Sequence, residues 1–402
     1  MRNKLSEYNF KNFDLSLLVS AILLGIIGAI VLHLIPGVAE NMPLKQILGV
    51  FFGFCLAIFV SLFDYHFVAK FYIILYILNL AMLILVKFTK FGISVYGAKR
   101  WLGIEDVFSF QPSELTKIIM IIVMAKFFDL FKERLHKFST LILAGIIMGI
   151  PTFLIAIQTD LSTSIVLVVC FSVMVFASGY SLKILGILIV IFVPSFSVLF
   201  WYVQQPTQKL LKPYQQDRIL SLLNPEAYPD LIYQQKNAVE AISSGGLLGK
   251  AFTEDTGIRG TAYVPVIESD FIFTAIGEEF GFVGAMIVIL LLTFIAFRIM
   301  LIGSNSCDMI GKIISVGAAS IIIAQAFVNI GVVSMILPNT GIPLPFVSSG
   351  LSSVVGCYSM LGVVLNISIN QKKGTKRGAY DLDCCFMVAP LIGQRTSRNF
   401  RI

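Results

Sequence analysis

The stretch LSLLVSAILLGIIGAIVLHL (residues 15–34) runs for 20 residues without a lysine, an arginine or an acidic side chain. A helix of this length and character can cross the roughly 30 Å of hydrocarbon in a bilayer. The run is longer than the apolar core of a typical signal peptide, and no small-x-small cleavage site follows it. We therefore expect it to be a retained first membrane span.

The composition of the whole chain extends this expectation. Of its 402 residues, 57% are hydrophobic and 13% are charged, and the mean hydropathy is +0.88. In a soluble protein about a quarter of the residues are charged, because its surface must face water. The apolar residues are also concentrated in long runs. Lipid is therefore the expected solvent for most of the fold.

Ten apolar runs are predicted to be transmembrane helices, so the predicted fold class is an all-α integral membrane protein. The runs are Leu15–Leu34, Ile47–Phe63, Phe71–Val86, Leu115–Leu130, Leu141–Ile157, Leu161–Ala177, Ile184–Val203, Phe271–Phe297, Ile313–Leu337 and Val347–Ile369. The fourth run is the weakest, because Lys117 and Lys126 interrupt it. Those two lysines would extend to opposite membrane interfaces.

The distribution of basic residues predicts the orientation. In a ten-span chain three basic groups fall on one side: Arg2, Lys4 and Lys11; Lys132, Arg134 and Lys137; and Lys372, Lys373, Lys376 and Arg377. Basic loops mark the cytoplasmic side. We expect a cytoplasmic N-terminus (residues 1–14), a ten-span domain (15–370) and a cytoplasmic basic tail (371–402). The net charge of +7 then reflects topology, and nucleic acid is not an expected partner.

Three polar segments would face the outside: Lys87–Pro112, Gln158–Asp160 and the long loop 204–268 between spans seven and eight. Function resides in such segments more often than in lipid-facing helices. Within the long loop, Tyr233–Ile242 fits a short amphipathic helix ended by Gly245 and Gly246. The preceding Ser243-Ser244 with this glycine pair forms either a plain turn or a nest of amides for a phosphate.

Ionisable residues near the ends of spans are costly, and by default they indicate a functional site. Glu114 and Lys117 are either such a site or an i,i+3 pair that orients a helix. Asp160 precedes Ser162 and Thr163 and is expected to cap the next helix through their amides.

Asp270 lies at the predicted outer interface, where burial raises a carboxylate pKa and suits it to act as a general base. The alternative is that Ser269 or Asp270 caps the helix that follows. Of the adjacent Glu278 and Glu279, at least one should face the interior of the bundle.

A proline-rich segment separates the last two spans. Leu337–Gly350 contains three prolines and two glycines, which enforce a non-helical backbone. Irregular backbone near membrane depth is tolerated where it is buried in protein or lines a cavity. We expect this segment to form a cavity wall near the outer surface.

These motifs together resemble the SEDS proteins, the FtsW, RodA and SpoVE cell-wall polymerases of bacteria. The motifs that carry the resemblance, over about residues 15–370, are Gly97-Ala98-Lys99-Arg100-Trp101, Gln111-Pro112-Ser113-Glu114, Gln158-Thr159-Asp160-Leu161-Ser162-Thr163, the Tyr-Gln and Ser-Gly-Gly-Leu-x-Gly-Lys parts of the long loop, Asp270-Phe271-Ile272-Phe273 with Glu278-Glu279, and Gly341-Ile342-Pro343-Leu344-Pro345-Phe346. The short tail favours likeness to RodA. Six motifs in this order are a specific match.

The resemblance implies a peptidoglycan glycosyltransferase that polymerises lipid II on the outer face of the cytoplasmic membrane. It also implies a class B penicillin-binding protein as partner. The family's essential aspartate, in its Pro-Glu-x-His-Thr-Asp-Phe motif, corresponds to Asp270. This chain departs from that motif, with Val266 for the glutamate, Glu268 for the histidine and Ser269 for the threonine. Glu268 would raise the pKa of Asp270 by like-charge coupling.

The implied reaction joins the C4 hydroxyl of an acceptor N-acetylglucosamine to the anomeric carbon of a lipid-pyrophosphate-linked muramyl sugar, with inversion. Asp270 is the candidate base, or alternatively a ligand for a divalent cation such as Mg²⁺ or Mn²⁺ on the pyrophosphate. The candidate substrate-binding residues are Lys99, Arg100, Glu114, Lys117, Asp160, Arg218, Lys250 and Glu278. The first alternative function is a flippase or transporter of lipid-linked precursors. The second is a scaffold without chemistry.

Overall fold

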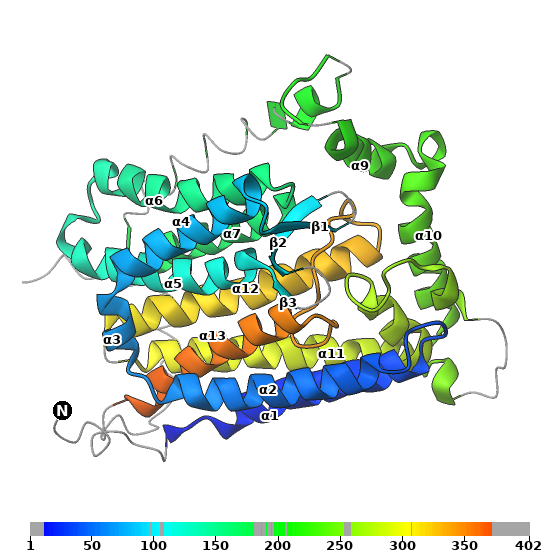
Figure 1. Ribbon diagram of the computed structural model, residues 1–402, viewed down its shortest axis with the longest axis horizontal. Helices are drawn as coiled ribbons and strands as arrows, with labels where there is room; N and C mark the ends of the chain where they lie inside the picture. Colours follow the sequence, from blue (N-terminus) through cyan, green and yellow to red (C-terminus); the bar gives the residue numbers. More distant parts are fainter. Residues whose placement is uncertain are drawn as a thin grey trace, which may run out of the picture.

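The computed structural model describes residues 12–371, except 96–97, 105–107, most of 181–199, 206, 212, 253–258 and 307. Its long helices run parallel and antiparallel in one bundle (Figure 1). These helices are α1 (Leu15–Leu34), α2 (Met42–Ser61), α4 (Tyr72–Phe88), α5 (Pro112–Leu130), α6 (Phe138–Ile157), α7 (Leu161–Ala177), α11 (Ile272–Ser304), α12 (Met309–Val333) and α13 (Leu351–Ile369).

Shorter elements lie at the ends of the bundle. They are the helices α3 (Tyr65–Lys70), α9 (Pro213–Leu223) and α10 (Pro229–Ser244) and the 3-10 turns η3 (Lys132–Arg134), η4 (Pro225–Ala227), η5 (Lys250–Phe252) and η6 (Gly260–Tyr263). Helix α10 stands across one end of the bundle, and α3 lies at the other (Figure 1). The amphipathic helix predicted over Tyr233–Ile242 is confirmed as part of α10, and it ends at Gly245.

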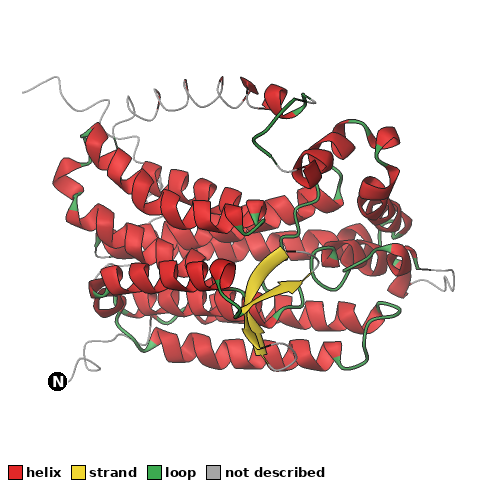
Figure 2. Cartoon of the chain, turned by 45° about the horizontal axis from the view of Figure 1, so that its top comes forward, coloured by secondary structure: helices red, strands yellow, loops and turns green. Residues whose placement is uncertain are grey.

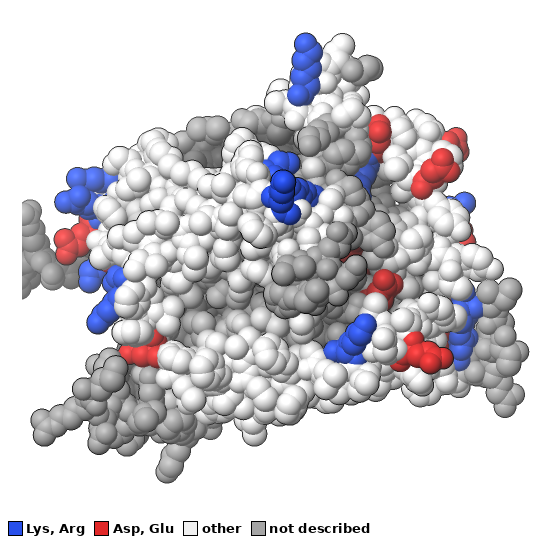
Figure 3. All heavy atoms as spheres, viewed as in Figure 1, with Lys and Arg blue, Asp and Glu red and all other residues white. Residues whose placement is uncertain are grey.

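The helices support a multi-pass membrane protein. Among the described residues, α1, α2, α6, α11, α12 and α13 are long and apolar enough to cross a membrane, and α4 and α7 are apolar but shorter. Charged side chains gather toward the two ends of the bundle, with an uncharged band between them on the visible face (Figure 3). The predicted span Ile184–Val203 lies largely outside the described residues.

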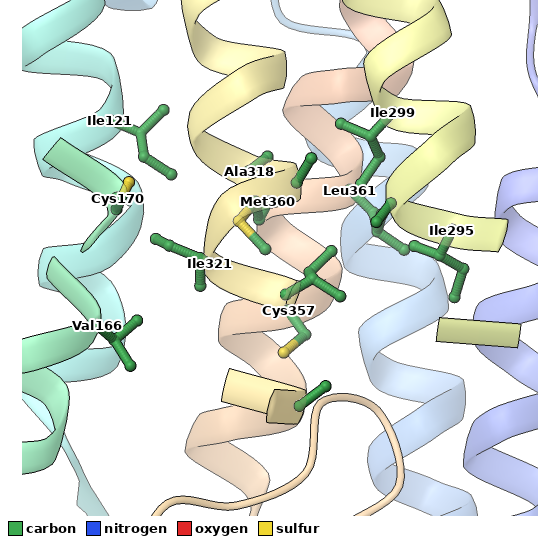
Figure 4. Close-up of a cluster of buried hydrophobic side chains, with 14 of the residues drawn as sticks. Ile121, Val166, Cys170, Ile295, Ile299, Ala318, Ile321, Cys357, Met360 and Leu361 are labelled. Atoms are coloured by element: carbon green, nitrogen blue, oxygen red, sulfur yellow. The ribbon is translucent and has the colours of Figure 1, made fainter. Parts of the chain in front are cut away.

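Helix α12 runs through the middle of the apolar core, between α5 and α7 on one side and α11 and α13 on the other (Figure 4). Small residues allow the close approach, as is usual between membrane helices. A Cβ added at Gly317 of α12 would lie 3.0 Å from Ile121 of α5. The core fixes the helix ends, and therefore the loops that carry the site.

The all-α prediction is wrong for the outer segment Lys87–Pro112. This segment contains the strands β1 (Gly92–Val95), β2 (Ala98–Ile104) and β3 (Phe108–Phe110), which form an antiparallel sheet in that order (Figure 2). Ile93 lies opposite Trp101, and Leu102 lies opposite Phe110. Aromatic and β-branched side chains favour such cross-strand pairs. The sheet places Lys99 and Arg100 on β2.

Candidate active site

The loops around Asp270 meet at one end of the bundle, where α5, α7, α11 and α13 begin and α12 ends; we call it the site end (Figure 1). Asp270 lies two residues before α11, and its Oδ1 accepts a hydrogen bond of 2.7 Å from Ser269 Oγ. The helix is capped by Phe271, with no side-chain cap hydrogen bond. The alternative that Ser269 or Asp270 caps α11 is therefore wrong.

The predicted non-helical backbone of Leu337–Gly350 is confirmed, and part of this segment lies directly against Asp270. Gly341 has a φ of +70°, and a Cβ added there would lie 3.1 Å from Asp270 Oδ2. Ser348 Oγ donates to the Ser269 carbonyl at 2.6 Å, and Ser349 Oγ donates to the Glu268 carbonyl at 2.7 Å. These contacts hold the proline-rich segment along three consecutive residues of the Asp270 loop.

Asp160 joins two helix starts at the site end. Its Oδ1 accepts from the amide of Thr163 at 3.2 Å, so the predicted capping of α7 is confirmed. Its Oδ2 accepts from Gln111 Nε2 at 3.1 Å and from Ser113 Oγ at 3.3 Å, at the start of α5. Arg100 of β2 donates to the carbonyl of Thr159. The small sheet is therefore tied to the same loop as Asp160.

Burial raises the pKa of the Asp270 carboxyl above its ordinary value. The neighbouring carboxylates of Glu268 and Asp160 raise that pKa further, whereas the hydrogen bond from Ser269 and the charge of Arg100 lower it. Burial disfavours a charged carboxylate because it removes water from the group. A carboxyl group whose pKa is raised in this way is suited to take up a proton from a substrate.

Backbone strain is concentrated around the same loops. Among the described residues, the non-glycine residues with positive φ are Thr159, Val266, Met335 and Phe346. Each of them lies in a connection at the site end, between two helices or before α11. Such conformations cost about 1–3 kcal/mol each and persist where the surrounding structure imposes them. Strain of this kind clusters at functional sites, which supports a functional reading of this end.

Glu114 and Lys117 form the predicted i,i+3 pair inside α5. Lys117 Nζ lies 2.8 Å from the Glu114 carboxylate, and each residue is only 4% exposed. A Cβ added at Gly356 of α13 would lie 3.3 Å from Glu114 Oε2. The pair therefore lies between α5 and α13, and a buried pair of this kind is expensive to break.

The other predicted cations make contacts to backbone carbonyls at the site end. Lys99 Nζ donates to the carbonyl of Thr89 at 2.6 Å. Arg218 of α9 donates to the carbonyl of Asn339, in the proline-rich segment, at 3.2 Å. Arg100 and Arg218 therefore contact the loops that surround Asp270 from two different outer segments.

Lys250 and Glu278 belong to a second group, which fixes the long loop to α11. Glu278 is 0% exposed, and its Oε1 accepts from Lys250 Nζ at 2.6 Å and from the amide of Gly260 at 2.7 Å. Its Oε2 accepts from the amide of Thr261 at 2.8 Å. Glu279 is also buried and pairs with Arg259 at 3.0 Å. Both glutamates are buried, as expected for at least one of them, but the groups that bind them belong to the long loop and not to the interior of the helix bundle.

The glycine turn after α10 fits around a break in α11. Gly281 has a φ of 63° inside that helix, and the amide of Phe282 donates to the carbonyl of Gly246 at 2.9 Å. A Cβ added at Gly245 would lie 2.0 Å from the carbonyl oxygen of Gly277, and one at Gly249 would lie 2.1 Å from that of Glu279. Close approach of two backbones explains these glycines, so the structure favours the plain turn over a phosphate nest.

Asn329 of α12 is a site residue that sequence reasoning missed. Its Nδ2 donates to the carbonyls of Asp270 and Ile342, each at 2.7 Å. An amide inside a predominantly apolar run was the available signal, because polar residues within spans are rare and usually functional.

The described residues contain no group of three or more His, Cys, Asp or Glu side chains that could hold a metal ion.

Comparisons with known proteins agree with this architecture. Residues 14–373 match the FtsW/RodA/SpoVE family of cell cycle proteins. The peptidoglycan glycosyltransferase MrdB (RodA) of Escherichia coli is 33% identical over 304 residues, which are 75% of this chain and 79% of MrdB.

Two solved structures share the fold. One is from a peptidoglycan synthase complex with coordinated polymerization and crosslinking, at a TM-score of 0.73 and 23% identity, covering 91% of this chain and 99% of that chain. The other is Thermus thermophilus RodA, at a TM-score of 0.62 and 21% identity, covering 91% and 98%. The chain belongs to the FtsW/RodA/SpoVE family of cell cycle proteins, and within that family it resembles RodA.

Proposed function

We propose that this protein is a peptidoglycan glycosyltransferase that polymerises lipid II into glycan strands at the outer face of the bacterial cytoplasmic membrane. One observation carries the proposal: the partly buried carboxylate of Asp270 is held between α11 and the proline-rich segment, at the end where Arg100 and Arg218 converge. The relationship to MrdB, which bears that activity in its name, supports the reaction class.

The proposed topology has ten spans and cytoplasmic termini, with the site end outside. The basic residues Lys132, Arg134 and Lys137 support this, because they follow α5 at the end of the bundle opposite Asp270 (Figure 1). The long loop with α9 and α10 then lies outside, above the site. Lipid II presents its sugars and pyrophosphate at the same surface, while its chain stays in the bilayer.

In the proposed reaction Asp270 takes the proton of the acceptor C4 hydroxyl. The hydroxyl oxygen forms a bond to the anomeric carbon of the donor, and the bond from that carbon to the pyrophosphate oxygen breaks with its electrons on the leaving group. One displacement inverts the configuration. Cations stabilise the charge that develops on a leaving pyrophosphate. Arg100 and Arg218 are the proposed cations, together with Lys99 of the same sheet.

The proposed partner is a crosslinking enzyme of the class B penicillin-binding type. The structure of the peptidoglycan synthase complex supports this, because there polymerization and crosslinking are coordinated. The outer elements α9 and α10 stand at the same end of the bundle as the site (Figure 1), and in the proposed complex they contact the partner's outer domain.

Removing the charge of Glu268 should shift the pH dependence of the reaction. A base works in its deprotonated form, so kcat/KM should rise with pH through the pKa of Asp270. The Glu268 carboxylate raises that pKa, so in Glu268→Gln the acidic limb should move to lower pH. The measurement is the pH profile of kcat/KM for lipid II. Glu226→Gln, an exposed carboxylate of the same long loop, is the control and should leave the limb in place. An unmoved limb in Glu268→Gln would contradict the coupling.

Reconstitution with a defined orientation tests the proposed function. Proteoliposomes that contain lipid II should accumulate glycan strands. Protease added outside identifies the molecules whose C-terminal tail is inside the vesicle, because that tail is protected. The strands made by those molecules should be outside, where added muramidase digests them. A flippase would move lipid II between leaflets and make no strand. If strands form only on the side of the membrane that carries the C-terminal tail, the proposed orientation is wrong.

A further inference from the structure

The side chain of Asn329 connects both the Asp270 loop and the proline-rich segment to helix α12. The Asn329 amide donates one hydrogen bond to the Asp270 carbonyl and another to the Ile342 carbonyl, each at 2.7 Å. Asn329 is 1% exposed and lies on α12, the helix at the centre of the core. Both accepting carbonyls lie outside helices, where no helical amide satisfies them. The bridge therefore fixes two irregular segments to one rigid helix.

The carboxamide of Asn329 is chemically suited to bridge two carbonyl oxygens. A neutral carboxamide offers two N–H donors on one nitrogen, whereas a carboxylate offers none. Among the residues that the structure describes, Asn329 Oδ1 is buried with no hydrogen-bond partner, so the side chain is held by what it donates. An unmet buried acceptor carries a desolvation cost of about 1–3 kcal/mol.

The second carbonyl belongs to the residue after Gly341, and Gly341 faces the carboxylate. A Cβ at Gly341 would lie 3.1 Å from Asp270 Oδ2, while Ser269 Oγ holds Oδ1 at 2.7 Å. Any shift of Ile342 relative to Asp270 therefore changes the space beside Oδ2. Misplacement of a reacting group by about 1 Å can cost about 10²-fold in rate.

We propose that Asn329 is a positioning residue, which holds the Asp270 carboxylate in register with the proline-rich segment. This inference rests on the proposed function, because it assigns Asn329 its effect through Asp270. Loss of the two hydrogen bonds releases the Asp270 and Ile342 carbonyls from α12, so the Gly341–Ile342 part of the segment can shift relative to Asp270 even though Ser348 and Ser349 still bind the loop. The apolar contacts of α12 keep the bundle folded.

The test compares variants of two buried asparagines, Asn329 at the site end and Asn366 at the opposite end of the bundle. Asn329→Asp keeps the shape but has no donor as a carboxylate and only one O–H when protonated, and Asn329→Leu removes every donor together with the unmet oxygen, so one of them should fold even where the other does not. We expect kcat for lipid II polymerisation to fall about 10–100-fold, with KM changed less than about threefold.

Asn366 of α13 is the matched control. It is also fully buried, and its Nδ2 donates to the Ser61 carbonyl at 2.7 Å, at the opposite end of the bundle. Asn366→Leu should lower the thermal midpoint and leave kcat of the folded protein within about threefold.

A double variant separates positioning from general damage. If Asn329 acts through Asp270, then Asn329→Leu should add less than about threefold to the loss caused by Asp270→Asn, because residues that act as a unit are not additive. A kcat unchanged in both Asn329 variants, or losses that multiply in the double variant, would overturn the inference. Full activity of Asp270→Asn would instead remove Asp270 from the mechanism, and a folded, unchanged protein that makes no strands would overturn the proposed function, so the failures are distinguishable.

Discussion

Asp270→Asn should lose nearly all lipid II polymerisation while the protein inserts and folds as before. The amide has nearly the shape of the carboxylate but cannot accept the proton of the acceptor hydroxyl. General-base action contributes about 10²–10⁴-fold, so the initial rate should fall by that factor. The rate is measured as strand formation from purified lipid II at equal concentrations of folded protein. The Asn329 contact does not depend on the charge, because it is made to the main chain of Asp270, and Ser269 Oγ can donate to the amide oxygen of the asparagine as it does to the carboxylate.

A matched control is available at the other end of α5. Asp129 pairs with Lys126 at 2.9 Å and is part-exposed, so Asp129→Asn also removes one carboxylate charge. Its strand formation should stay near that of the unchanged protein. Equal losses in both variants would indicate a general effect of charge, and an active Asp270→Asn protein would remove Asp270 from the mechanism.

Glu278 of α11 binds the long loop, and Glu278→Gln should lower the stability of the protein more than a conservative change within the long loop itself. The carboxylate accepts from Lys250 and from the amides of Gly260 and Thr261. The glutamine amide would place its N–H group against one of these donors and would take away the negative charge that lies 2.6 Å from the Lys250 ammonium. Breaking a buried ion pair from one side costs about 3–5 kcal/mol. The measurement is the thermal midpoint in detergent, together with proteolysis of the loop that carries α9 and α10.

Two further variants distinguish a structural from a substrate-binding role for this pair. Glu240→Gln alters an exposed carboxylate of α10 and should leave the midpoint unchanged. Adding Lys250→Gln to Glu278→Gln should recover part of the lost stability, because the second change removes the positive charge that Glu278 neutralised. If Glu278→Gln keeps its midpoint but loses activity, then Lys250 and Glu278 serve substrate as the sequence first suggested.

Local chemistry explains what could be predicted from the sequence. The runs Leu15–Leu34 and Leu161–Ala177 have the same bounds as α1 and α7, because each is an uninterrupted apolar segment of helical length. The cap at Asp160 and the pair of Glu114 with Lys117 also follow from neighbours three positions apart. Such features depend on the residues nearby, so a single sequence contains the information.

Contacts between distant segments could not be predicted in this way. Asn329 joins residues 59 positions before it and 13 after it, and Lys250 meets a carboxylate 28 positions away. The sheet of Gly92–Phe110 was also missed, because its short strands depend on contacts with their neighbours more than on intrinsic propensity. The position of Asp270 at the outer interface suggested a base, and the family resemblance favoured that role over a helix cap, whereas the side chains that hold Asp270 needed the fold.

Strand formation from purified lipid II by the purified protein is the most direct test of the central claim. The assay contains no other glycosyltransferase, and it is run with and without a crosslinking partner whose transpeptidase is blocked. We expect glycan strands in the presence of the partner, and none when Asp270→Asn replaces the unchanged protein. If the folded protein makes no strands with or without the partner, this chain is not the polymerase.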